Sequence, residues 1–301
     1  MTREIIHFAH ANGFPARTYG KMLDALASHF EIGYIDRHGH NPDFPVTDGW
    51  DRLRDELRRE IETRYTRPVI GVGHSLGGIL HFLVAVEKPE LYKQIILLDA
   101  PIISPLSSSA LRIMKTLKLI DRYTPSQMTR LRRRSWPDKQ EAYEHFKQKE
   151  LFSAFDDDVL RDYVEYGLTP GETGLELYFT PRVEARIYRT LPHHLPGFRG
   201  KLRVPAAYIG GTNSREARLA RLDYMKKHFP FDFYSIEGSH LFPFEKPLET
   251  AEKIREIAGR RMTGAQASRF ALSAKREQMR NRRSSYFHSR LPLALANGQR
   301  P

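Results

Sequence analysis

The chain has 301 residues, of which 40% are hydrophobic, and it contains no cysteine. Disulfides, thiolate nucleophiles and cysteine-ligated metals are therefore excluded, and no apolar run approaches the ~18 residues of a transmembrane helix. The formal charge is +12, and the N-terminal stretch MTREIIHFAH lacks the pattern of a signal peptide, so we expect a cytoplasmic protein without a transmembrane segment.

Short β-branched runs alternate with helical patterns along the first part of the chain. EIIHFAH and EIGYID are predicted strands, each followed by a helix; in the second helix Trp50, Leu53, Leu57 and Ile61 form one apolar stripe. PVIGVGH and KQIILLDAP are more continuously apolar, as expected of strands buried on both faces. This alternation predicts an α/β fold, with a doubly wound, mostly parallel sheet of about six strands.

The alternation is interrupted by a long insertion. Residues 104–195 are helical in pattern, charged and aromatic, with no recognisable strand. The alternation then resumes with the strand VPAAYIGG, one helix through SREARLARLDYMKKHF, the strand FDFYSIEG and a last helix. We therefore divide the chain into a core of residues 1–103 and 196–261, with residues 104–195 as a helical cap over the ligand crevice at the sheet edge.

Residues 262–301 hold much of the excess positive charge. They contain eight Arg and Lys against one Glu, and the pattern resembles a poorly ordered tail. We expect a solvated extension, with weak contact to acidic surfaces such as nucleic acid or membrane as the functional alternative. No specific nucleic-acid partner is expected.

The segment GVGHSLGG, residues 71–78, places a serine between glycines where a strand turns into a helix. Gly73, Ser75 and Gly77 match G-x-S-x-G, a pattern that is weak alone but stronger between a strand and a helix. The small neighbours allow a sharp turn that presents the Ser75 hydroxyl at the carboxyl edge of the sheet. We therefore predict Ser75 to be a catalytic nucleophile.

A serine hydroxyl needs a base to take its proton. Of thirteen histidines, His240 follows the last predicted strand, in GSHLFPFEKP, and we interpret it as this base. Other histidines, such as His7, His38 and His145, are expected to be structural or surface residues.

At this point the chain resembles the α/β-hydrolase fold family, over about residues 3–260. The motifs that carry the resemblance are HANGFPA, DRHGHNP, GHSLGG, LLDAP and GSHLFPFEKP. The family commonly begins with an antiparallel strand pair, which this chain lacks, so the resemblance implies a sheet shortened to six strands. It also places a cap or lid where the helical insertion lies. The resemblance implies a serine hydrolase that requires no cofactor.

The acid of the triad is ambiguous. Many members of the family carry an aspartate after the next-to-last strand, but this chain reads YIGGTNSREAR there. Asp99 ends the strand that comes after the helix following Ser75. Some relatives place their acid there, and we favour Asp99. Glu216, expected on the following helix, is the second candidate, and a dyad without an acid is the third.

An oxyanion hole needs two backbone N–H groups. One is expected from Leu76, the residue after the nucleophile. By resemblance the second comes from the HANGF loop, with Asn12 favoured over Phe14.

Other chemistries have weaker support in the sequence. H-E-x-x-H, EF-hand and P-loop motifs are absent, and the glycines of GVGHSLGG are spaced wrongly for a dinucleotide fingerprint. His38 and His40 are interpreted as a loop around Gly39 rather than a metal pair, so we expect no metal.

The expected reaction is hydrolysis of a carboxylic ester or thioester, with a small hydrophobic acyl compound as substrate. The cap is rich in aromatic residues that would suit such a substrate, although most are expected to be ordinary core. The basic run TRLRRRSW would instead favour a carboxylated substrate or a phosphate-bearing thioester if it lined the entrance.

The alternative functions are those of a lactonase, a carbon–carbon bond hydrolase, an acyltransferase or a non-catalytic binding protein of the same fold. Dehalogenase and epoxide hydrolase chemistry is disfavoured, because those relatives carry Asp at the position of Ser75.

Overall fold

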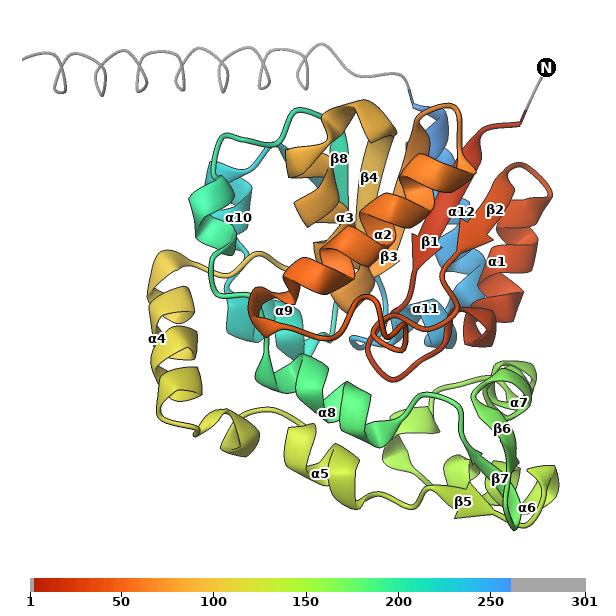
Figure 1. Cartoon of the computed structure of the whole chain (residues 1–301). Coiled ribbons are helices and arrows are strands. Elements are labelled where there is room, and N and C mark those ends of the chain that lie inside the picture. Colours follow the sequence, from red (N-terminus) through yellow and green to blue (C-terminus); the bar gives the residue numbers. More distant parts are fainter. Residues whose placement is uncertain (1–2, 261–301) are drawn as a thin grey trace, which may run out of the picture. The chain divides into compact units, whose positions relative to one another are not determined.

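The computed structural model describes residues 3–260, so the predicted basic tail, residues 262–301, lies outside the described residues. A six-stranded parallel sheet with the order β2-β1-β3-β4-β8-β9 forms the centre of this part (Figure 1). The strands are β1 (Ile5–Ala9), β2 (Glu31–Tyr34), β3 (Val69–His74), β4 (Tyr92–Leu98), β8 (Ala206–Gly211) and β9 (Phe231–Ile236). The predicted doubly wound sheet of six strands is confirmed.

Helices cover both faces of the sheet, which explains why its central strands are apolar along their whole length. Every residue of β3 and β8 is buried, and β4 exposes only Lys93. One core cluster packs α1 (Gly20–Ala27) and α12 (Pro247–Gly259) on the sheet, and a second packs α2 (Asp51–Arg64), α3 (Leu76–Glu87) and α10 (Asp223–His228). Within residues 3–260, no helix has the length and apolar character that crossing a membrane requires.

The insertion lies between β4 and β8 and differs from its prediction. Its helices are α4 (Pro105–Thr116), α5 (Ser126–Leu131), α6 (Lys139–Lys147), α7 (Asp157–Tyr166) and α8 (Pro181–Arg189). It also contains a small antiparallel sheet of β5 (Ser135–Trp136), β6 (Leu168–Gly171) and β7 (Gly174–Leu177). The prediction of an insertion without strands was therefore wrong, because strands of two and four residues are too short to show an alternating pattern.

The helix predicted through SREARLARLDYMKKHF is also wrong as a single element. The structure has α9 (Arg215–Ala220) and α10, separated at Arg221, whose φ of 52° is left-handed and cannot continue a right-handed helix. The short α11 (Phe242–Glu245) precedes α12. The break lets α9 lie beside the carboxyl edge of the sheet, where the candidate site is located.

Candidate active site

Ser75 occupies a strained turn between β3 and α3. Its backbone has φ 50° and ψ −109°, a conformation that a non-glycine residue adopts only when its surroundings impose it. A Cβ on Gly73 would lie 2.3 Å from the carbonyl carbon of Gly77, and a Cβ on Gly77 would lie 2.0 Å from the carbonyl oxygen of Ala9. The backbone is packed so closely at Gly73 and Gly77 that a larger side chain would not fit. Both positions therefore require glycine, as the G-x-S-x-G interpretation assumes.

Backbone hydrogen bonds hold this turn against the neighbouring strands. The Ser75 N–H donates to the Leu98 carbonyl at 2.9 Å, and the Gly77 N–H donates to the His10 carbonyl at 3.1 Å. Ser75 is half-buried and precedes the N-terminus of α3, a helix of 12 residues. The positive end of the helix dipole therefore lies directly behind the hydroxyl.

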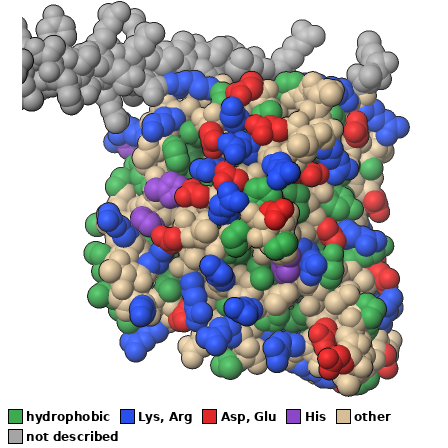
Figure 2. Space-filling model, in the orientation of Figure 1, with side chains coloured by type: hydrophobic (Ala, Val, Ile, Leu, Met, Phe, Trp, Pro, Cys, Tyr) green, Lys and Arg blue, Asp and Glu red, His purple; other side chains and the backbone are tan. Residues whose placement is uncertain are grey.

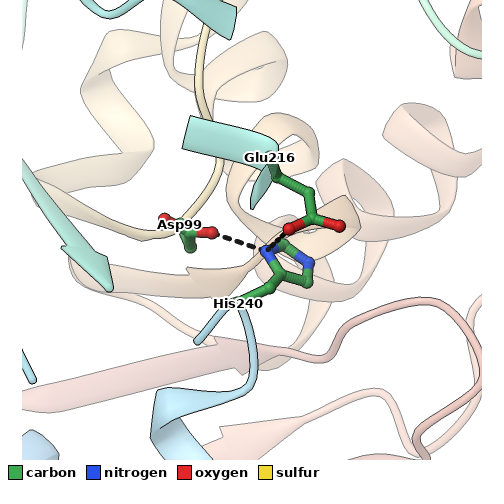
Figure 3. A group of neighbouring side chains, drawn as sticks. All are labelled: Asp99, Glu216 and His240. Carbon is green, nitrogen blue, oxygen red and sulfur yellow. Dashed lines mark hydrogen bonds and ion pairs between the residues drawn. The ribbon is translucent and has the colours of Figure 1, made fainter. Parts of the chain in front are cut away.

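His240 and Asp99 form a close pair at the same edge of the sheet. His240 Nδ1 lies 2.6 Å from Asp99 Oδ2, whereas Glu216 Oε2 is 3.8 Å from the same nitrogen (Figure 3). The side chain of Asp99 is fully buried, and that of Glu216 is 48% exposed. Of the two acids left open by the sequence, Asp99 therefore holds the histidine, and Glu216 approaches it from the solvent side on α9.

Asp99 is surrounded by hydrogen-bond donors. Besides His240, it accepts from the Tyr208 hydroxyl at 3.0 Å, the Ser214 hydroxyl at 2.5 Å and the Gly211 N–H at 3.4 Å. Burial alone would raise the pKa of Asp99, but the bonds from His240, Ser214 and Tyr208 outweigh it and the pKa is lowered. The carboxylate therefore stays ionised despite its burial.

The charge of Asp99 acts in turn on His240. Burial would lower the pKa of the imidazole, but the hydrogen bond and the negative charge of Asp99 outweigh this effect, so the pKa of His240 is raised above its usual value. With Nδ1 held by Asp99, Nε2 is the ring nitrogen left to exchange a proton with another group.

His74 and Tyr19 connect the loops of the site. His74 is fully buried, and its Nε2–H donates to the His240 carbonyl at 2.8 Å. Its Nδ1 accepts from the Tyr19 hydroxyl at 2.8 Å, and that hydroxyl accepts from the Ala11 N–H at 3.1 Å. Burial, together with the nearby His240, lowers the pKa of His74 to about 3, so the ring is neutral. One chain of hydrogen bonds thus joins the loop after β1, the serine turn at the end of β3 and the loop that carries His240.

Tyr19→Phe should lower the free energy of unfolding by about 2 kcal/mol, because it leaves the Ala11 N–H and His74 Nδ1 buried without partners. Urea denaturation at neutral pH measures this loss. Tyr234→Phe is the matched control, since within residues 3–260 that hydroxyl bonds only to the exposed Arg260, and its removal should change stability by less than about 0.5 kcal/mol. Equal losses in the two variants would contradict the role given to Tyr19.

The loop after β1 contains Asn12 and Phe14, the two residues that the sequence offers as an oxyanion donor. Among residues 3–260 no acceptor is found for the backbone N–H groups of Asn12 and Leu76, whereas the Phe14 N–H donates to the Ala11 carbonyl at 3.2 Å. The runner-up Phe14 is therefore used by the turn itself. The Asn12 side chain donates to the Glu184 carbonyl on α8 at 3.1 Å, so the insertion packs directly on this loop.

Among residues 3–260, one group of possible metal ligands is found at the site, and the sequence singled out His38 and His40 as a second. Ligand atoms of Asp99, Glu216 and His240 lie within 4.8 Å of one another, but both oxygens of Asp99 already accept hydrogen bonds from the protein. His38 contacts Glu56 through Nδ1, and His40 accepts from the Thr180 N–H through Nε2. Both groups are thus engaged in structural hydrogen bonds.

Comparisons with known proteins agree with this fold. Residues 8–253 match the model of the alpha/beta hydrolase family. The abhydrolase domain-containing protein AKT2 of Alternaria alternata is 30% identical over 231 residues, covering 63% of this chain and 82% of that protein. The crystal structure of E-2-(acetamidomethylene)succinate hydrolase superposes with a TM-score of 0.67 at 19% identity, covering 86% of this chain and 92% of the other. A Mycobacterium tuberculosis esterase gives a TM-score of 0.65 at 19% identity, covering 86% and 87%.

The chain therefore belongs to the alpha/beta hydrolase family, and it is a hydrolase.

Several residues of the site were not found from the sequence. Ser214 and Tyr208 hold Asp99, and Tyr19 holds His74, through contacts between distant segments of the chain. Only Ser214 carried a local signal, because it caps α9 by accepting from the Ala217 N–H, a role that its position before a helix predicts.

Proposed function

We propose that this protein is a serine hydrolase that cleaves a carboxylic ester or thioester, with Ser75 as nucleophile, His240 as general base and Asp99 as the acid of the triad. The observation that carries the proposal is the strained serine turn beside a buried, hydrogen-bonded His–Asp pair. His74, the neighbour of Ser75, bonds to the His240 carbonyl, which brings the two segments together. The same three roles recur in serine hydrolases of unrelated folds.

The reaction proceeds in two steps. The Ser75 oxygen attacks the acyl carbon while His240 Nε2 takes the hydroxyl proton, and His240 then gives this proton to the departing alcohol or thiol. In the second step His240 takes a proton from water while the water oxygen attacks the acyl carbon. His240 then returns this proton to the Ser75 oxygen as the acyl–serine bond breaks, which releases the acid and restores the Ser75 hydroxyl. Asp99 stabilises the imidazolium formed in both steps and fixes the ring tautomer through Nδ1.

The negative charge of the tetrahedral intermediate needs donors. We assign this role to the backbone N–H groups of Leu76 and Asn12, for which no acceptor is found within residues 3–260. The N-terminus of α3 adds the positive end of its dipole.

The substrate is proposed to be a small molecule with a hydrophobic acyl group, enclosed by the insertion, residues 104–195, acting as a cap over the site. The Phe14 ring of the oxyanion loop lies 5.5 Å from the Tyr163 ring of α7 and 4.9 Å from that of Phe244. Phe155 stacks on Phe244 at 5.0 Å. These four rings are buried in one core cluster, so they hold the insertion against the loop and make the surroundings of the site apolar, which suits an apolar acyl group.

Lactone opening, carbon–carbon bond hydrolysis and acyl transfer to an alcohol use the same nucleophile and base, so they remain alternatives on this site. Solved structures of the same fold include an enol-lactonase and a thioesterase domain. A panel of p-nitrophenyl esters of graded chain length, with thioesters and lactones, separates these reactions by kcat/KM.

A fluorophosphonate probe tests the nucleophile. We expect the wild-type protein to be labelled on Ser75 and Ser75→Ala to be unlabelled. Ser239→Ala is the matched control, because Ser239 lies beside His240 but bonds to Glu245, and it should label as wild type. Absence of labelling in the native protein would favour a non-catalytic binding protein, and labelling that survives Ser75→Ala would reject this nucleophile.

A further inference from the structure

The insertion exposes an unusual number of large hydrophobic side chains. Nine such residues are exposed in the described part of the chain, and six of them lie between residues 106 and 131: Leu106, Ile113, Leu117, Tyr123, Met128 and Leu131. Scattered single hydrophobic residues are normal on a surface, but this concentration within one short segment is not.

Two of these residues, Leu106 and Ile113, lie on one face of α4, and Leu117, its C-cap, continues the same face. Leu106, Ile113 and Leu117 are spaced seven and four residues apart, so they form a stripe along the helix, and they are 82%, 58% and 60% exposed. Leu111 and Ser108, which are buried, lie on the opposite face. A surface helix ordinarily turns polar residues to solvent, whereas α4 is apolar on its outer face as well.

Basic side chains are frequent in the same segment of the chain. Residues 105–134 contain eight Arg and Lys and one acidic residue, Asp121, which is paired with Arg189. Five of the eight are exposed and form no direct ion pair within residues 3–260: Arg112, Lys118, Arg122, Arg130 and Arg134. Figure 2 shows hydrophobic and basic side chains together at the left margin and lower left, where Figure 1 draws α4 and α5.

We propose that this surface, formed by α4, α5 and the segment between them, binds the surface of an anionic phospholipid bilayer. Exposed Leu, Ile, Met and Tyr side chains suit the boundary between headgroups and acyl chains, and unpaired Arg and Lys suit anionic headgroups. A second copy of the chain is less favoured, because a two-fold contact would bring these like charges together. The surface contains none of the residues proposed to be catalytic.

Binding to vesicles tests the proposal with the full-length chain. We expect binding to vesicles of equal parts phosphatidylcholine and phosphatidylglycerol, and much weaker binding to phosphatidylcholine alone. The measurement is repeated at about 0.5 M salt, where contacts made by charge alone are largely screened. The triple variant L106S/I113S/L117S should bind at least about tenfold more weakly at both salt concentrations, because it removes the inserted apolar side chains.

The double variant L219S/L248S is the matched control, since Leu219 and Leu248 are exposed leucines at 68% and 56% outside this surface. It should bind as wild type, and both variants should keep the wild-type melting temperature and rate on a soluble ester. Equal vesicle binding by the triple variant and wild type would overturn the proposal. So would a wild-type dimer in light scattering that the triple variant converts to monomer, since the surface would then join two copies.

Discussion

Asp99→Asn should lower kcat for ester hydrolysis by about four orders of magnitude. The asparagine keeps the size of the side chain but loses the charge that stabilises the imidazolium. Its amide can also select the wrong tautomer, since an NH₂ group facing Nδ1 requires that nitrogen to accept. In the native protein the Tyr208 hydroxyl donates to Oδ1 of Asp99 and the Ser214 hydroxyl donates to Oδ2. Whichever of these two oxygens the amide NH₂ replaces, it faces a hydroxyl that donated to the carboxylate.

The pH dependence gives a second readout of the same variant. A general base acts in its neutral form, so the raised pKa of His240 places the rising limb of kcat/KM above the ordinary histidine value of about 6.5. Removing the charge of Asp99 leaves the burial of His240, which lowers the pKa. The rising limb of the residual activity should therefore move to lower pH.

Glu216→Gln is the matched control for Asp99→Asn. Glu216 lies 3.8 Å from His240 Nδ1 and is 48% exposed, so solvent screens its charge and its loss should change kcat by less than about tenfold. Steady-state kinetics on one ester compares the two variants directly. A larger loss in Glu216→Gln than in Asp99→Asn would transfer the role of the acid to Glu216.

The choice between these two acids illustrates what the sequence could establish. Chain order places both Asp99 and Glu216 near the carboxyl edge of the sheet, because each follows a strand that ends there. What separates them is burial and the surrounding donors, and these depend on Tyr208, Ser214 and Gly211 in another strand and loop. Such contacts have no local spacing that a sequence pattern could show.

The sheet and the serine turn were predictable because their determinants are local. Continuous apolar runs follow from strands buried on both faces, and Gly73 and Gly77 follow from backbone contacts under 3 Å within the turn and with β1. The small sheet of β5, β6 and β7 was missed, since its strands are shorter than the period needed to recognise them. The break at Arg221 was missed because no glycine or proline marks it.

Acidification should destabilise the protein steeply, because several histidines are buried in their neutral form. His7, His10, His74 and His81 are fully buried, and burial lowers the pKa of each, to about 3 for His74 and His81. The unfolded chain binds protons at these side chains below pH ~6.5 while the folded chain does not. Stability therefore falls as pH falls from about 6.5 toward the folded-state pKa values.

The size of the effect follows from the number of sites. His74 and His81, with pKa values of about 3, each cost up to about 1.4 kcal/mol per pH unit, so together they cost roughly 5 kcal/mol between pH 6.5 and 4.5. The lowered pKa values of His7 and His10 add to this loss. His240 opposes this slightly, because its raised pKa favours the folded state at low pH. A loss of this size is a large fraction of the stability of a typical domain, about 5–15 kcal/mol, so we expect the protein to unfold at a much lower urea concentration at pH 4.5 than at pH 7.

Urea denaturation at several pH values between 7 and 4.5, monitored by circular dichroism, measures this dependence. His7→Phe should reduce the slope of the free energy of unfolding against pH by about one proton, because it removes one of these titrating groups. Both ring nitrogens of His7 are buried without a hydrogen-bond partner within residues 3–260, so the substitution breaks no hydrogen bond there. A phenyl ring also fits the same ring contacts with Tyr65 and His81. His29→Gln, at an exposed position, is the control and should leave the slope unchanged. Two outcomes would contradict the prediction: a free energy of unfolding that stays constant down to pH 4.5, or a slope against pH that His7→Phe does not change. Either would mean that these histidines bind protons in the folded protein, although burial among other histidines provides no negative charge to stabilise the charged ring.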